Sequence, residues 1–87
     1  MAPTPEEIIT QAQLADRALG EARAAVDKTI AMLDELARHY VVVNDQPRFA
    51  ATQSATATTR EITAEISAAL DAVDRASTKI RGISQGR

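Results

Sequence analysis

The chain contains no cysteine and no tryptophan, and its 87 residues include one tyrosine and one phenylalanine. Without cysteine, disulfides, thiolate metal sites and thiol nucleophiles are excluded. With so few aromatic residues, any core must be built from small and branched aliphatic side chains. A single chain of this length buries only about 60% of the surface that it exposes when unfolded. We therefore expect a thin core, for which oligomerisation is the usual remedy.

Long hydrophobic runs and an excess of one charge are also missing. The apolar runs 30–33 and 40–43 fall far short of the ~20 residues that a membrane span needs. The N-terminal residues show neither the basic nor the apolar region of a Sec signal peptide. Ten basic and twelve acidic residues give a net charge of −2, which supplies no field to attract nucleic acid. These features predict a soluble, cytoplasmic chain that binds no nucleic acid; export without a Sec signal is the alternative.

A helix start is indicated by Thr4-Pro5-Glu6-Glu7. Thr4 can cap the helix, Pro5 suits the first helical position, and Glu7 can complete a capping box. From there to Tyr40 the chain contains a single glycine, no proline and many good helix formers. The sequence predicts one helix over about 5–41.

A turn over about 42–46 and a second helix over about 47–83 follow, with a tail at 84–87. Asn44 lies in the turn, and Pro47 pre-sets its own φ for a helical first turn. The stretch 50–59 consists of Ala, Thr, Ser and Gln, so it is either helical or flexible. A rival helix start at 58–61 is less favoured because it would leave a loop of about 17 residues in a small domain.

Both helices show a heptad repeat of apolar and small residues, which predicts an all-α, antiparallel two-helix hairpin resembling a coiled coil. Folding the chain about Asn44 pairs residues whose numbers sum to 88. The expected pairs are Ile8 with Ile80, Ala12 with Ala76, Ala15 with Val73, Leu19 with Ala69, Ala22 with Ile66, Val26 with Ile62, Thr29 with Thr59, and Leu33 with Ala55.

Ile9, Ile30 and Leu70 fall at e positions beside this seam, and Met32 falls at a g position. Burying one such side chain is worth roughly 1.5–3 kcal/mol, so leaving all four in water would be a real loss for a small domain. We expect them to form an oligomer interface. Two hairpins packed as a homodimeric four-helix bundle, or one hairpin packed on a similar helical partner, would bury them. The alternative is a marginally stable monomer with scattered surface aliphatics.

No pattern of catalytic or cofactor-binding residues is evident. Glu35 and His39 lie four apart but point largely outward in the heptad, so we expect a helix-end histidine and no metal site. The glycines form no phosphate-binding loop, and no Ser or Thr has a base at a recognisable spacing. The hairpin tip contains Tyr40, Asn44, Pro47 and Phe49. Its two aromatic rings either plug the end of the bundle or form a binding knob.

A cysteine-free, alanine-rich helical hairpin of about this length with no Sec signal resembles the small Trp-x-Gly proteins of bacterial type VII secretion, although its turn reads Tyr40-Val-Val-Val-Asn44. Members of that family dimerise as four-helix bundles and act as secreted substrates, chaperone partners or effector modules. This sequence carries neither Trp-x-Gly at the turn nor a C-terminal Tyr-x-x-x-Asp/Glu motif. The residues themselves predict a non-enzymatic interaction and oligomerisation module. The resemblance implies the alternative of a secreted type VII-associated factor or a partner of an exported protein.

Overall fold

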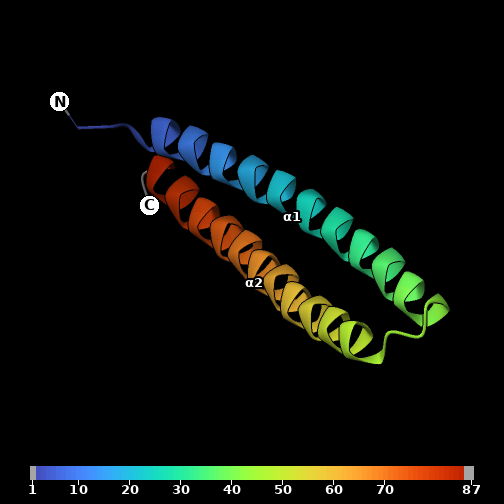
Figure 1. The fold of residues 1–87 in the computed structure, drawn as a ribbon. Helices are drawn as coiled ribbons and strands as arrows, with labels where there is room; N and C mark the ends of the chain where they lie inside the picture. The colour runs from blue at the N-terminus through green and yellow to red at the C-terminus, as the bar shows by residue number, and fades with distance from the viewer. Residues whose placement is uncertain (1, 86–87) are drawn as a thin grey trace.

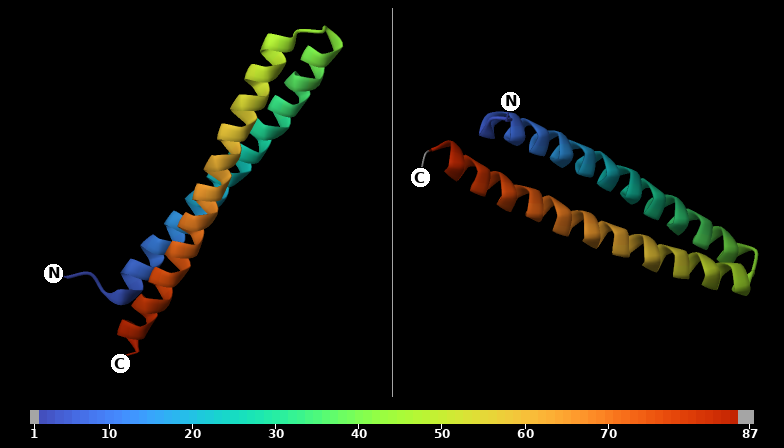
Figure 2. Two further views of the ribbon diagram at one scale, coloured as in Figure 1. Left: turned by 90° about the horizontal axis from the view of Figure 1, so that it is seen from below. Right: turned by 90° about the vertical axis from the view of Figure 1, so that its left-hand side faces the viewer.

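The computed structural model describes residues 2–85 as two long helices, α1 (Pro5–Val42) and α2 (Gln46–Ser84). The helices run antiparallel, side by side along their whole length, and both ends of the chain lie far from the turn (Figures 1 and 2). The all-α hairpin is therefore confirmed. Each helix end lies within one residue of its predicted place. Of the predicted tail, Ser84 belongs to α2, Gln85 caps it, and 86–87 lie outside the described residues.

The helix starts follow from local side-chain chemistry. The Thr4 hydroxyl accepts a hydrogen bond from the Glu7 backbone amide at 3.1 Å, as the capping pattern predicts. Residues 50–59 are helical throughout, so neither a flexible stretch nor a late start at 58–61 occurs. The hydroxyl of Thr52 donates to the carbonyl of Arg48, and that of Thr56 donates to the carbonyl of Thr52. With their polar atoms satisfied in this way, both threonines lie buried against α1.

The turn between the helices is closed by backbone hydrogen bonds. The Asp45 amide donates to the Tyr40 carbonyl at 2.9 Å, and the Asn44 amide donates to the Val41 carbonyl at 3.1 Å. This pair of bonds is a Schellman motif, whose central residue must adopt a left-handed conformation. Asn44 does so with a φ of 56°. Asparagine tolerates that conformation better than most residues, and Asn44 therefore ends α1 without a glycine.

The next residue, Asp45, is the N-cap of α2. Its carboxylate accepts the Arg48 backbone amide at 3.1 Å and the Arg48 guanidinium at 2.8 Å. These two bonds lower the pKa of Asp45, the backbone amide contributing most. At the other end of the hairpin, the Ser84 hydroxyl donates to Glu6 at 2.6 Å and lowers the pKa of that carboxyl group. Because both pKa values are lowered on folding, both groups stabilise the fold at neutral pH. This stabilisation is lost as the pH falls through the folded-state pKa values.

Buried and half-buried positions recur every three or four residues along the facing sides of the two helices. They mirror one another about the turn, which places opposite each other residues whose numbers sum to 89. The pairs are Ile9 with Ile80, Ala12 with Ser77, Leu19 with Leu70, Val26 with Thr63, Ile30 with Thr59, Leu33 with Thr56, Ala37 with Thr52, and Tyr40 with Phe49.

The predicted register, with pairs summing to 88, is therefore wrong by one residue. Positions 12, 19, 26 and 33 belong to both seams, but 9, 30 and 37 take the places that the heptad reading assigned to 8, 29 and 36. Ile8 and Leu36 are 41% and 40% exposed. The apolar stripe on α1 is wider than one seam, so the repeat alone admits two rotations of the helix. The structure adopts the rotation that turns Ile9, Ile30 and Ala37 toward α2.

The core between the helices is thin. Ala37 and Ile66 are the fully buried aliphatic residues among those described, and they are joined by Thr52, Thr56 and Ser77. The hairpin is also elongated, with a radius of gyration of 19.6 Å against about 12 Å for a compact domain of this length. A single hairpin thus gains little of the apolar burial that normally offsets chain entropy.

Replacing Thr63 by valine is expected to stabilise the protein. The Thr63 hydroxyl is buried and has no hydrogen-bond partner, unlike that of Thr56, which donates to Thr52. Valine keeps the shape and removes the desolvation cost, which raises the free energy of unfolding by about 1 kcal/mol and Tm by roughly 4–8 °C. Thr56→Val, the matched control, loses a satisfied hydroxyl and should change Tm much less. Thermal unfolding followed by circular dichroism would contradict this if the two variants shifted Tm alike.

Candidate interaction surface

One side of the hairpin combines the exposed seam-flanking residues of both helices. A shallow pocket on the opposite side is lined by Gln13 of α1 and by Asp74, Thr78 and Arg81 of α2. The positions beside the seam that these residues represent therefore lie on the same side of the hairpin. By helical periodicity, the remaining flanks share the other side, which we call the broad face. Its residues are Ile8, Gln11, Ala15, Ala18, Ala22, Ala25, Thr29, Met32, Leu36 and His39 on α1, and Arg48, Ala51, Ala55, Thr58, Ile62, Glu65, Ala69, Ala72, Ala76, Lys79 and Ile83 on α2.

The broad face carries few charges: Glu65 and Lys79 along its length, and His39 and Arg48 where its two stripes reach the tip. Met32 is 61% exposed and Ile62 42% exposed. Beside Met32, an open and largely apolar depression of about 470 Å³ lies against α1, lined by Thr29, Met32, Leu33 and Leu36. Small residues, mostly alanine, surround these larger ones. Such a surface lets another helix approach closely, and exposed apolar area of this extent marks an interaction site.

The opposite side of the hairpin has the contrary character. Its flanking positions carry charges of both signs interspersed along both helices, as expected of a solvated helix face. These residues are Glu6, Arg17, Asp27, Asp34 and Arg38 on α1, and Arg60, Asp71, Asp74 and Arg81 on α2. The difference between the two sides therefore marks the broad face as the side suited to a partner.

The four residues expected at an oligomer interface differ in exposure within the single hairpin. Ile9, Ile30 and Leu70 are half-buried between the two helices, so the heptad assignment that put them outside the hairpin seam is corrected. Met32 lies on the broad face. Ile8, Leu36 and Ile62, which had been placed in the hairpin seam, are instead exposed on the broad face.

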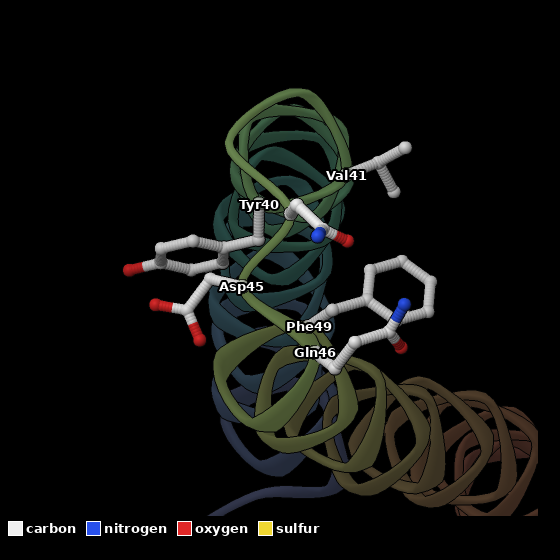
Figure 3. Close-up of a pocket in the computed structure, with 6 residues that line it drawn as sticks. Tyr40, Val41, Asp45, Gln46 and Phe49 are labelled. Carbon is white, nitrogen blue, oxygen red and sulfur yellow. The ribbon is translucent and has the colours of Figure 1, made fainter.

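The tip residues surround a small pocket of about 150 Å³, lined by Tyr40, Val41, Asn44, Asp45, Gln46 and Phe49. Figure 3 shows the rings of Tyr40 and Phe49 pointing to opposite sides of the tip. The predicted plug, with the rings packed on each other, is therefore wrong. Tyr40 instead lies 5.5 Å from the His39 ring, measured between centroids. Pro47 takes its expected place in the first turn of α2.

The valines that follow Tyr40 do not pack against the two rings either. Val41, Val42 and Val43 are 62%, 82% and 52% exposed. The left-handed turn at Asn44 directs the chain straight into α2, so the valines stay on the outside of the tip. They form an exposed apolar group at one end of the molecule.

The described part of the chain contains neither a cluster of metal-ligating side chains nor a membrane-spanning helix. No three His, Asp or Glu side chains there are close enough together to share a metal ion. Neither of the two helices contains a stretch sufficiently long and apolar to cross a membrane. No family model matches the sequence, and neither a curated protein nor a solved structure matches it.

Proposed function

We propose that the chain is a non-enzymatic self-association module, in which two hairpins pack through their broad faces into a four-helix bundle. The observation that carries this proposal is the contrast between a broad face with few charges and a highly charged opposite side. Four-helix bundles bury such faces against one another. The alternative role of a type VII-associated secreted factor stays a prediction.

The exposed area supports self-association. The hairpin exposes 6440 Å², whereas a compact monomer of 9.3 kDa exposes about 5,000 Å². The excess of about 1,400 Å² exceeds the ~800 Å² that each partner buries in a standard interface. With dimensions of 65 × 17 × 16 Å, one broad side of the hairpin offers on the order of 1,000 Å² for such contact. A second hairpin would thus supply the apolar burial that the thin core lacks.

Sedimentation equilibrium on the purified protein tests the proposal. Across micromolar concentrations we expect a mass twice that of the 9.3-kDa chain. Helix content by circular dichroism should fall on dilution below the dissociation constant, because the single hairpin has so little core. A mass of one chain at every concentration, with full helix content, would refute self-association.

A further inference from the structure

Two hairpins can pack by their broad faces in two ways that keep all neighbouring helices antiparallel. With the two-fold axis parallel to the helices, the two tips lie at the same end, and α1 of each copy packs on α2 of the other. With the axis perpendicular to the helices, the tips lie at opposite ends, and each helix packs on its own copy. The choice between them rests on the self-association proposed above and determines which helices of the two copies are in contact.

We infer that the dimer has its tips at the same end, because only this arrangement brings opposite charges of the other copy near Glu65 and Lys79 of α2. Residues at equal height in the hairpin have numbers that sum to 89. In the same-end dimer, height is preserved between copies. Each outward-lying position of α2 on the broad face then meets an outward-lying position of α1 from the partner copy, about one residue (~1.5 Å) away in height.

Glu65 is the critical residue. In the same-end dimer it lies at the height of Ala25 of the partner copy, one helical turn from that copy's Lys28. Glu61 lies at the height of Lys28 itself. The two carboxylates of α2 therefore flank a lysine across the interface rim. The geometry resembles the interhelical ion pairs at the edges of coiled coils, which set partner orientation.

Lys79, the other charge along the length of the broad face, also finds an opposite charge. Its height matches that of Gln11 of the partner copy, one turn from that copy's Glu7. The apolar layers fit as well. Leu36 lies near Ala55 of the partner copy, and Ile62 lies near that copy's Thr29. The Thr29 hydroxyl is already satisfied, because it donates to the Ala25 carbonyl at 2.9 Å.

The opposite-end dimer is disfavoured by the same residues. When the hairpins overlap fully, Glu65 comes level with Glu65 of the other copy, and Glu61 lies one turn away on each side. Four carboxylates would then gather at one rim, with no lysine beside them. On the other rim Lys28 would meet Glu21, but the carboxylates of α2 would still have no opposite charge beside them.

The same-end arrangement has a consequence for the tip. It brings together the exposed Val41, Val42 and Val43 of both copies at one end of the bundle. The N-terminal ends of both α1 helices and the C-terminal ends of both α2 helices lie at the other end (Figure 1). The dimer would therefore be polar along its length, with one apolar end.

Disulfide cross-linking distinguishes the arrangements, because the natural chain contains no cysteine. Ala18→Cys mixed with Ala72→Cys is expected to give a cross-linked heterodimer in high yield, since those positions lie at nearly equal height across the interface. Ala25→Cys alone should stay unlinked, because the two copies of residue 25 lie at opposite corners of the bundle. A disulfide forms only when the Cα atoms approach within about 7 Å. Each chain in the mixture carries one cysteine, so no disulfide can form within a hairpin.

The opposite result would overturn the inference. Ala25→Cys linking to itself, with the 18/72 mixture unlinked, would establish the opposite-end dimer. Failure of both to link in a protein whose mass is that of a dimer would show that another surface is used. A mass of one chain would instead refute the self-association on which the inference rests.

Charge reversal gives a second measurement that does not depend on disulfide geometry. Glu65→Lys and Lys28→Glu should each raise the dissociation constant by roughly fivefold, and the double variant should raise it by less than the two single changes combined. In an opposite-end dimer, Glu65→Lys would lower the dissociation constant, because it removes the repulsion between carboxylates. The sign of that single change therefore decides between the two arrangements.

Discussion

Replacing Ile62 by glutamate is expected to separate the proposed dimer into single chains. Ile62 lies in the middle of the broad face, and at 42% exposure in the lone hairpin it can be replaced by a charged side chain that reaches water. In the bundle the same position is covered by the second copy. The variant loses about 1.5–3 kcal/mol of apolar burial per side chain and adds the cost of burying an unpaired charge. The dissociation constant should rise at least about 100-fold, as measured by sedimentation equilibrium.

Ala64→Glu is the matched control. Residue 64 lies two positions along the same helix, on the charged side of the hairpin, and is exposed. It introduces the same charge into the same helix, but away from the broad face, so the mass should remain that of two chains. Equal dissociation of both variants would show that the effect of Ile62→Glu arises from added charge in general. Neither variant dissociating would place the interface elsewhere.

Replacing Ile66 by alanine is expected to destabilise the fold more than any other single truncation. Ile66 is the one large aliphatic side chain that is fully buried among the described residues, at 8% exposure. Truncation of a buried isoleucine costs about 2–5 kcal/mol, which is much of the ~5–10 kcal/mol that holds a small domain together. Tm should therefore fall by more than about 10 °C in thermal unfolding.

Leu14→Ala provides the comparison for this prediction. Leu14 lies on the outer side of α1, 48% exposed, so the same kind of truncation there removes little burial. Alanine is also the better helix former. The stability should change by no more than about 0.5 kcal/mol. If Leu14→Ala proved as damaging as Ile66→Ala, the core would not lie where the structure places it.

The candidate surface was only partly predictable from the sequence. The heptad repeat predicted two sets of apolar residues, one inside the hairpin and one on its surface, but it exchanged their members. It placed Ile8, Leu36 and Ile62 in the contact between the helices. It placed Ile9, Ile30 and Leu70 on the surface for a partner. On α1 the apolar positions fall in two adjacent stripes, each with the spacing of a heptad seam. Periodicity alone cannot say which stripe faces α2 and which faces outward, because both satisfy it equally.

Local sequence determined the helices and their ends. Thr4 and Asp45 cap, Pro5 and Pro47 begin their helices, and Asn44 adopts the left-handed turn, all through groups within a few residues of one another. Such short-range chemistry can be read in a single sequence. The rotation of each helix about its own axis was decided by the tertiary structure. That rotation depends on packing between residues far apart in the chain. A shift of one residue in the register exchanges the buried stripe for the exposed stripe, so the rotation determines which residues form the broad face.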